Sequence, residues 1–510
     1  MTTISKVESH QAVVPGAIAS RLVLGIILSA FGGAMLFLAF PPYNVWPLIW
    51  VGFVPYLIAQ HRVMPRRYSP LAPAIAIAVW WWPMLARIFA GGPWFLVHLG
   101  LILAVITLVT STERKFHEHT RYRWFVLQGV VNWVGFEMIR SFIPVLGTMG
   151  FVANTQAGQA WLIQPVSIFS IYGLGLIILL TNFALAQVGL ALIDRRWPVE
   201  DAVPVDVRST RRWAAGVGIG LAAWIGLSLT ILGSAPQNAP TVRVAALQPG
   251  FPEPAHIDPS TPQDLRVQTL LALGREAAGQ GAKVLFTPEL GMAIDPQREY
   301  TSDFKALTAE TGAYAFLTYG LDTEAGFRNE AVPLTPAGQF LPVYGKIHPG
   351  PGEPKAIYSD VYPVYDTPWG RLATVICMDS NFTDVTRRLA QLGAQLIAVP
   401  TRETQGISEQ TWTHHVFRAV ETRTAMVKTD VAWGSTIIDP YGRILDMTVV
   451  PEATRLSLVG DVPLGSGDAP VVQLGDWVGW IALAGFVFFI IFQAITDRRA
   501  KKESSHDAHS

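Results

Sequence analysis

Long apolar stretches constrain this chain more than any other feature of its sequence. The hydrocarbon core of a bilayer is about 30 Å thick, and a helix of about 20 apolar residues crosses it. Eight stretches approach that length, seven before residue 240 and one after residue 470. The sequence therefore predicts a multi-pass α-helical membrane bundle, in which the long sixth stretch supplies a half-span and a full span. The expected spans are residues 22–40, 43–60, 71–90, 94–112, 124–144, 161–193, 213–233 and 476–496.

The composition supports a membrane protein and excludes other classes. Half of the residues are hydrophobic and 15% are charged, whereas about a quarter of the residues of a soluble domain are charged. The formal net charge is zero, so the chain lacks the basic field of a nucleic-acid-binding protein. The first apolar stretch runs into Phe40-Pro-Pro-Tyr43 without a small-residue cleavage site, which favours a retained membrane helix over a signal peptide.

Arginine and lysine residues alternate in a way that predicts the orientation of the bundle. They follow the second, fourth, sixth and eighth stretches, whereas the loops after the first, third and fifth carry essentially none. Because basic loops stay in the cytoplasm, we expect both termini to be cytoplasmic and the region after the seventh stretch to be extracytoplasmic. The basic residues are Arg62, Arg66, Arg67, Arg114, Lys115, Arg121, Arg123, Arg195, Arg196, Arg208, Arg211, Arg212, Arg498, Arg499, Lys501 and Lys502.

These spans divide the chain into four parts. We expect a transmembrane bundle of about seven helices at 1–235, an extracytoplasmic domain at 240–465, a transmembrane helix at 472–497 and a cytoplasmic tail at 498–510. In the extracytoplasmic part, strand-like runs alternate with helical periodicity, which is typical of a layered α/β domain. The expected strands are 242–248, 283–286, 313–320, 331–346, 372–377, 396–399, 431–438 and 443–447, and the expected helices are 263–279, 301–312, 384–392 and 409–426.

Cys377, the only cysteine, is the strongest candidate for a reactive group. One cysteine excludes an intramolecular disulfide and a cysteine-rich metal site. It ends an expected strand shortly before an expected helix, and a thiol placed there needs a base or a positive charge nearby to act as a nucleophile. Glu289 follows one upstream strand and Lys346 ends another. Each has an ordinary alternative, as a buried apolar cysteine or a solvated loop charge, but together they predict one convergent site.

The patterns around these three residues resemble those of the nitrilase superfamily. They are Pro288-Glu289, Tyr344-Gly-Lys346 and Val375-Ile-Cys377, and that superfamily uses a Glu base, a Lys and a Cys nucleophile in the same order. The resemblance covers residues 241 to 460. It implies that the extracytoplasmic domain is an αββα sandwich, so the whole chain is expected to be a membrane bundle carrying a nitrilase-like α/β domain.

The membrane part adds a narrower resemblance. Residues 39–48 (Ala-Phe-Pro-Pro-Tyr-Asn-Val-Trp-Pro-Leu), 136–141 (Phe-Glu-Met-Ile-Arg-Ser) and 164–173 (Gln-Pro-Val-Ser-Ile-Phe-Ser-Ile-Tyr-Gly) are similar to motifs of the bacterial apolipoprotein N-acyltransferases. That family implies a protein of the bacterial cytoplasmic (inner) membrane that needs no metal or cofactor. Its members transfer an acyl chain from a phospholipid to the α-amino group of the N-terminal diacylglyceryl-cysteine of an apolipoprotein.

The resemblance also implies a role for each site residue. Glu289 removes the proton of Cys377, and the thiolate attacks the phospholipid ester to form a thioester. Lys346 stabilises the oxyanion and lowers the thiol pKa. Glu353, in the Pro/Gly-rich loop after the lysine, matches a glutamate that supports the reacting groups, with a turn charge as the alternative. Asp379 stands where the family usually has a glutamate.

Two residue pairs leave alternatives open. Glu137 and Arg140 lie three apart on one face of an expected membrane helix. They form either a polar lining near a substrate path or a structural ion pair. His414 and His415 are adjacent and therefore point to different faces of a helix, which favours a structural role over a metal site.

Some segments near the expected site depart from the family pattern. Met378 replaces an aromatic residue, and residues 400–406 and 429–434 differ where the acyl and amine pockets are expected, so they bear on the substrate more than on the nucleophile. Loops 250–259 and 347–360 are expected to form apolar lids. Two further functions stay open: a membrane-tethered amidase or hydrolase with another acyl acceptor, and a non-catalytic relative that binds lipoproteins.

Overall fold

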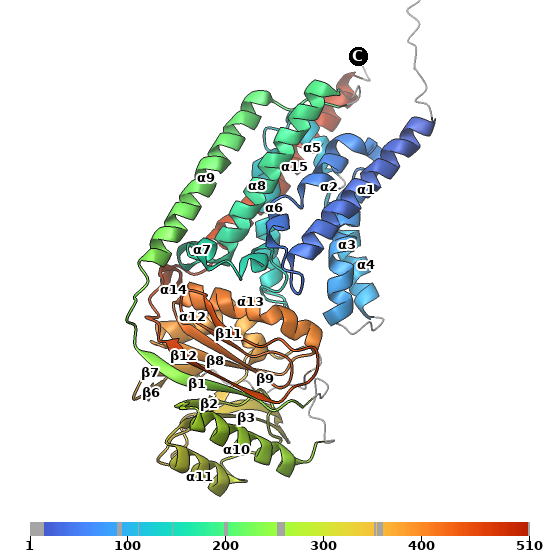
Figure 1. Cartoon of the computed structure of the whole chain (residues 1–510). Helices are drawn as coiled ribbons and strands as arrows, with labels where there is room; N and C mark the ends of the chain where they lie inside the picture. The colour runs from blue at the N-terminus through green and yellow to red at the C-terminus, as the bar shows by residue number, and fades with distance from the viewer. Residues whose placement is uncertain are drawn as a thin grey trace, which may run out of the picture.

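The computed structural model shows a helical bundle standing on a layered α/β domain (Figure 1). The chain leaves the bundle through α9 (Val207–Gly233), builds the α/β domain, and returns to the bundle as α15 (Trp477–Asp507). The structure describes residues 15–88, 94–110, 112–144, 146–197, 202–251, 261–350, 353, 357 and 361–507.

The bundle contains helices of very different lengths. Among the described residues, five are long and apolar enough to cross a membrane: Ile18–Ala39, Arg66–Arg87, Val166–Arg196, Val207–Gly233 and Trp477–Thr496. The expected tail continues α15 as far as Asp507, because its Ala, Lys, Arg and Glu residues are good helix formers. With α9 and α15, the helices on this side of the α/β domain are α1 (Pro15–Ala39), α2 (Val54–Ile58), α3 (Leu71–Ile88), α4 (Trp94–Thr110), α5 (Glu113–His119), α6 (Phe125–Ser141), α7 (Ala160–Ile163), α8 (Val166–Arg196) and α14 (Pro470–Leu474).

The expected span at 43–60 is wrong as a single helix. The chain instead forms a 3-10 helix at Trp46–Trp50, the short helix α2, and a π-helical turn at Ala59–Val63. Pro47 and Pro55 occupy this stretch, and each lacks the backbone N–H that a continuous helix would use. The segment is apolar, as the predicted span requires, but its prolines prevent one uninterrupted helix.

Asn182 of α8 satisfies the backbone that this break exposes. Its Nδ2 donates to Ile49 O at 2.8 Å, and its Oδ1 accepts the N–H of Phe53 at 3.1 Å. Unpaired backbone groups are costly at membrane depth, so this one amide makes the irregular segment tolerable. The expected half-span and span at 161–193 correspond to α7 and α8, and α8 is itself broken at Ser170, whose φ is 55°.

Buried ion pairs hold the end of the bundle that lies away from the α/β domain (Figure 1). Arg62 Nε lies 2.6 Å from Asp194 Oδ1 near the end of α8, and Arg114 Nε lies 3.0 Å from Glu118 Oε1 in α5. Both arginines are buried. Because a buried charge needs a partner, basic residues that predict cytoplasmic loops are also structural parts of the bundle.

Two six-stranded sheets form the α/β domain, with strand orders β12-β1-β2-β3-β4-β5 and β11-β10-β9-β8-β7-β6. Helices α10 (Gln263–Gly279) and α11 (Thr301–Thr311) cover the first sheet, and α12 (Thr383–Gln391) and α13 (Gln405–Thr422) lie between the second sheet and the bundle (Figure 1). This is the expected αββα sandwich. The strands are β1 (Thr241–Gln248), β2 (Val284–Phe286), β3 (Tyr314–Thr323), β4 (Gly326–Leu334), β5 (Tyr344–Gly345), β6 (Tyr365–Thr367), β7 (Gly370–Thr374), β8 (Leu396–Thr401), β9 (Ala425–Asp430), β10 (Thr436–Ile438), β11 (Ile444–Met447) and β12 (Leu456–Pro463).

The two sheets share an apolar core. It includes Phe286 and Phe316 from the first sheet and Leu372 and Val427 from the second. Fully burying one such side chain stabilises a fold by about 1.5–3 kcal/mol. The strands that precede the candidate reactive residues are therefore held by packing as well as by their hydrogen bonds.

The segment around residue 425 differs from the expectation. Helix α13 ends four residues before the expected helix 409–426 does, and β9 begins at Ala425 instead of at 431. Arg423 ends the helix in a left-handed conformation, with φ 52°. Its guanidinium donates to Gln164 Oε1 of the bundle at 2.9 Å. Because Arg423 and Gln164 are far apart in the chain, the local periodicity of the sequence could not predict this contact.

A buried glutamate ties α13 to the break in α8. Glu421 Oε1 accepts the N–H of Ile171 at 2.8 Å, directly after Ser170. Its other carboxylate oxygen lies 2.6 Å from Arg418 Nη2. A restarted helix has free N–H groups in its first turn, so Glu421 caps the second half of α8 from the other domain.

We predict that Glu421→Ala weakens the junction between bundle and α/β domain. It leaves the Ile171 N–H without an acceptor and the buried Arg418 without a counter-charge, so the free energy of unfolding should fall by about 3–5 kcal/mol. The measurement is the midpoint of thermal unfolding in detergent. The control is Glu310→Ala, whose partner Arg275 and own side chain are 45% and 58% exposed, and which should cost at most about 1 kcal/mol. Equal midpoints for the two variants would contradict this role.

Candidate active site

Cys377 lies at a sharp turn that follows β7. The strand ends at Thr374, earlier than the expected strand 372–377, and Cys377 begins a 3-10 helix that ends at Asn381. Its φ of 49° is left-handed, a conformation that costs about 1–3 kcal/mol and clusters at functional sites. Ser380 Oγ donates to Cys377 O at 2.8 Å and supports the turn.

Lys346 lies between two carboxylates. Its Nζ is 2.7 Å from Glu289 Oε1 and also contacts Glu353 Oε1. The same Glu289 oxygen accepts Nδ2 of Asn329 at 2.8 Å, and the other accepts the N–H of Arg402 at 3.0 Å. Glu289 and Lys346 follow strands of the first sheet, whereas Arg402 follows β8 of the second. Glu289 therefore connects the two sheets.

Two of these contacts were missed by reasoning from the sequence. Asn329 lies inside β4, and its backbone O also accepts the N–H of Lys346 at 2.9 Å. Arg402 contributes through its backbone N–H, which every residue except proline possesses. Neither the side-chain amide of Asn329 nor the backbone N–H of Arg402 stands in a recognisable local sequence pattern. Only the positions of the strands in the two sheets show that both groups reach Glu289.

Asp379 joins the lysine segment to the cysteine turn. Its Oδ1 accepts the N–H groups of Ile347 and His348 at 3.1 and 2.7 Å. Its Oδ2 accepts the hydroxyl of Tyr344 at 2.7 Å and the N–H of Ile376 at 3.0 Å. Four donors compensate for burying this charge. The carboxylate thereby aligns the chain after β5 with the chain after β7.

Burial and neighbouring charges set the protonation states. Burial lowers the pKa of Lys346, but Glu289, Cys377 and Glu353 raise it more, so this pKa lies well above its usual value and the side chain stays an ammonium. Burial raises the pKa of the Cys377 thiol, Glu289 raises it further, and Lys346 only partly opposes them. Lys346 thus lowers the thiol pKa as expected, but burial and Glu289 raise that pKa by more. The sulfur therefore rests as a neutral thiol, which would need a base in order to act as a nucleophile.

Glu137 and Arg140 lie outside this constellation. Within the described chain they form no direct ion pair, and each binds the loop after α6 instead. Glu137 Oε1 accepts the N–H of Val152 at 3.1 Å, and Arg140 Nη1 donates to Met149 O at 2.6 Å. The Arg140 guanidinium also lies 4.9 Å from the ring centroid of Phe151. These contacts favour the structural alternative, although through a loop rather than an ion pair.

The loop that these two residues hold reaches the cysteine turn. The N–H and the hydroxyl of Thr148 both donate to Asn381 O, each at 2.9 Å. Gly147 has a φ of 52°, and a Cβ atom there would lie 2.6 Å from Asn381 O. Only glycine permits this approach. The helical bundle thus contacts the turn that carries Cys377.

The two adjacent histidines bind different segments, as their positions on one helix predict. His414 Nδ1 lies 3.0 Å from Thr148 Oγ1, and His415 Nε2 lies 3.0 Å from Ser380 Oγ. Burial lowers the pKa of His414 to about 3, so its imidazole stays neutral. The His414 ring therefore serves the junction between bundle and α/β domain, whereas the His415 ring supports the cysteine turn inside the α/β domain.

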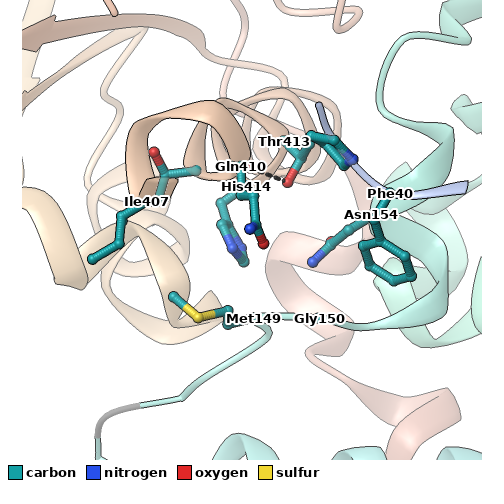
Figure 2. A pocket seen from close by; sticks show the side chains of 10 residues that line it. Phe40, Met149, Gly150, Asn154, Ile407, Gln410, Thr413 and His414 are labelled. Atoms are coloured by element: carbon teal, nitrogen blue, oxygen red, sulfur yellow. Dashed lines mark hydrogen bonds between the residues drawn. The ribbon is translucent and has the colours of Figure 1, made fainter. Parts of the chain in front are cut away.

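A small cavity lies beside His414, between the bundle and the first half of α13 (Figure 2). Glu289, Lys346 and Cys377 do not line it, so it belongs to the domain junction rather than to the reactive site. The lining residues are Phe40, Pro41, Met149, Gly150, Asn154, Ile407, Gln410, Thr411, Thr413 and His414.

The expected lid loops, 250–259 and 347–360, fall partly outside the described chain. In the second loop, Ile347 and His348 bind the carboxylate of Asp379, and Glu353 contacts Lys346. The residues of these loops that lie outside the described residues are 252–259, 351–352, 354–356 and 358–360.

Comparison with known proteins accounts for both parts of the chain. A family profile described as "Apolipoprotein N-acyltransferase N-terminal domain" matches residues 32–184, and one described as "Carbon-nitrogen hydrolase" matches residues 241–466. The chain is 26% identical over 502 residues to the apolipoprotein N-acyltransferase of Geobacter metallireducens, covering 90% of this chain and 93% of that one. It is also 26% identical over 509 residues to that of Gloeobacter violaceus, covering 90% and 92%.

Similarity to a curated amidase covers about a third of the chain. The human omega-amidase is 29% identical over 212 residues, which are 35% of this chain and 77% of that protein. The similarity over the full length is therefore to the N-acyltransferases. A solved structure of a mutant amidase from Nesterenkonia sp. AN1 covers 47% of this chain and 95% of its own at 23% identity, with a TM-score of 0.38.

We predict that Glu289→Gln changes two reactions of the thiol in opposite directions. The negative charge of Glu289 raises the pKa of Cys377, so its removal increases the thiolate fraction, and alkylation by iodoacetamide at pH 8 should accelerate about threefold or more. Acylation by an activated ester should instead slow by about 10²-fold, because the base is lost. Intact-protein mass spectrometry follows both, with Cys377→Ala as the unreactive control. Parallel loss of both reactions would mean that Glu289 only maintains the fold of the site.

Proposed function

Because the chain belongs to the apolipoprotein N-acyltransferase family, we propose that it catalyses the last acylation of bacterial lipoproteins. A phospholipid donates the acyl chain, and the acceptor is an apolipoprotein whose N-terminal cysteine already carries a diacylglyceryl group. The observation that carries the proposal is the buried Glu289–Lys346 pair beside the lone Cys377, in a chain that carries both the membrane and the hydrolase-type domains of that family.

In the first half-reaction Glu289 acts as the general base. It takes the proton of Cys377 Sγ while the sulfur attacks the ester carbonyl of the phospholipid. The ester C–O bond then breaks, and the proton on Glu289 passes to the leaving lysophospholipid oxygen. Because the thiol pKa is raised, proton transfer accompanies attack rather than preceding it. The acyl chain remains on the protein as a thioester.

Lys346 has the charge and the place to stabilise the oxyanion that forms on the carbonyl. Its side chain is 1% exposed, and a fixed charge in a buried site acts more strongly than one in water. In this mechanism Glu353 holds the lysine from its other side, and Asp379 aligns the lysine segment with the cysteine. In the second half-reaction the amino group of the acceptor attacks the thioester and Cys377 leaves as a thiol.

We also propose that the α/β domain lies on the outer side of the bacterial cytoplasmic membrane, with eight crossings and both termini in the cytoplasm. The buried Arg114 belongs to α5, which lies at the end of the bundle away from the α/β domain (Figure 1), and the buried Arg62 pairs with Asp194 near the end of α8. These positions support the orientation through the positive-inside rule. The irregular segment 43–60 is the second crossing in this arrangement. Both substrates are lipids, so a site beside the outer leaflet receives them directly.

The proposed function predicts an acyl adduct that can be transferred. Protein mixed with a phospholipid of defined chains should gain the mass of one acyl group. A diacylglyceryl-cysteine peptide added next should acquire that group as an amide, because the thioester is an activated acyl donor. Cys377→Ala should abolish both steps, whereas the wild type completes them. Mass spectrometry of protein and peptide measures the two steps separately.

Other outcomes distinguish the remaining functions. An adduct that yields only free fatty acid in the presence of the peptide would identify a hydrolase. No adduct with any phospholipid, together with a cellular role that survives Cys377→Ala, would identify a non-catalytic binding protein.

The orientation can be tested by cysteine labelling. Cys377→Ala has no cysteine left, so one introduced cysteine reports the side on which it lies. Asp322→Cys, at an exposed position at the end of β3, should react with a membrane-impermeant maleimide in intact spheroplasts. Arg195→Cys, exposed near the end of α8, should react only after the membrane is permeabilised. The reverse pattern would overturn the proposed orientation.

A further inference from the structure

A second buried charge cluster lies at the same edge of the second sheet as the reactive cysteine. Strands β7, β8 and β9 run parallel, and Thr401 of β8 pairs with Asp430 of β9. The carboxyl ends of these three strands therefore lie side by side. The first strand leads to Cys377, the second leads to Glu403, and the third ends at Asp430.

Lys428 is the centre of this cluster. Its Nζ lies 2.7 Å from Glu403 Oε2, 2.9 Å from Ser408 Oγ and 3.4 Å from Asp430 Oδ2. Thr411 Oγ1 donates to the same Glu403 oxygen at 2.8 Å. One ammonium thus faces two carboxylates. With both ionised, the cluster carries one uncompensated negative charge in a buried place, where such a charge is costly.

Glu403 differs from the other charged members of the cluster. Both oxygens of Asp430 are used, because Oδ1 accepts the N–H groups of Ala432 and Trp433 at 2.9 and 3.0 Å and Oδ2 faces the ammonium. Within the part of the chain that the structure describes, Glu403 Oε1 accepts no hydrogen bond. Glu403 is 7% exposed, whereas Lys428 and Asp430 are 0% exposed. Glu403 therefore keeps one acceptor oxygen for a ligand.

Glu403 is also close to the reactive groups. The N–H of the preceding residue, Arg402, donates to Glu289 Oε2 at 3.0 Å. The charge of Glu403 is among those that raise the pKa of Cys377. Burial raises the pKa of Glu403 itself to about 7, with Lys428 opposing the shift. A carboxylate with that pKa takes up and releases protons at neutral pH, as a general base should.

The second half-reaction must remove two protons from one nitrogen. An N-terminal amine has a pKa of about 7.7–8.0 and is mostly an ammonium at neutral pH. Only the free amine attacks a thioester, so one proton leaves before the N–C bond forms. A second proton leaves when the tetrahedral intermediate collapses to the amide, and the departing thiolate takes it through Glu289. The first proton therefore needs a different acceptor.

We propose that Glu403 binds the α-ammonium of the acceptor and removes its first proton. This inference rests on the proposed acyl transfer and names the residue that recognises the amine. The nitrogen lone pair then forms the N–C bond, the C–S bond breaks, and Cys377 recovers its proton from Glu289. Glu403 returns its own proton to water. Lys428 and Thr411 hold the carboxylate through one oxygen and leave the other for the substrate.

Glu403→Gln tests the proposal because it keeps the shape of the side chain and removes the base. Cys377 is first acylated from phospholipid, and transfer to the peptide amine is then followed by mass spectrometry in a single turnover. Acylation should change by less than about threefold, and transfer at pH 7 should fall about 10²-fold. The matched control is Glu409→Gln, on helix α13, which begins two residues after Glu403. Glu409 is paired with Arg87 at 3.1 Å, and the change should leave both steps unchanged.

The pH dependence separates proton removal from a structural role. Transfer by the native protein should rise with pH through about 7, where Glu403 loses its proton. In Glu403→Gln it should follow the ionisation of the amine itself and approach the native rate near pH 9. Thr411→Val keeps the carboxylate but removes a hydrogen bond that lowers its pKa. That variant should move the midpoint of the profile to higher pH.

Three results would overturn the proposal: native transfer by Glu403→Gln at every pH, a transfer defect that persists at pH 9, or equal loss of acylation and transfer. If Glu403→Gln does not fold, an unshifted midpoint in Thr411→Val overturns it instead. Native protein that forms the thioester but never acylates the peptide refutes the proposed function and this inference together. Failure of the proposed function is therefore seen already with the wild-type protein, whereas failure of this inference alone is seen only when the variants are compared with it.

Discussion

Two buried carboxylates, one from each sheet, hold the candidate reactive groups of this protein together. Glu289 of the first sheet accepts the N–H of Arg402 at the edge of the second, and Asp379 of the second accepts the N–H groups of Ile347 and His348 at the edge of the first. Each carboxylate has several donors, which offset the loss of hydration on burial. Separating the sheets here would remove one donor from Glu289 and three of the four donors from Asp379. The geometry of the site is therefore a property of the whole sandwich.

The helical bundle reaches the same site through its irregular segments. Glu421 of the α/β domain binds Ile171 at the break in α8, and Thr148 of the loop after α6 binds Asn381 at the end of the cysteine turn. A regular helix uses its backbone groups internally, whereas a break leaves some of them free. The breaks thus become docking points, because the other domain supplies the missing partners. This explains why the cysteine turn packs against the bundle.

Local patterns predicted the elements that bury one continuous face, such as the helix at 263–279, whose bounds match α10. The sequence also predicted that Glu289, Lys346 and Cys377 converge on one site, because each residue stands at or near the end of an apolar strand. Prediction failed at 425–430, where Lys428 and Asp430 give a buried strand a polar appearance. Those side chains belong to an internal charge cluster, which periodicity cannot distinguish from a solvent-facing surface.

By itself the sequence determined the long apolar helices of this protein, its α/β domain and its three expected reactive residues, because hydropathy, periodicity and strand-end chemistry are local properties of a chain. Only the tertiary structure decided that the Cys377 thiol rests in its neutral form, that Asp379 joins two segments, and that Glu403 and Lys428 stand beside them. These features depend on burial and on charges that are distant in the chain. Electrostatic energy is set by separation in space and by the surrounding dielectric, neither of which the linear sequence displays.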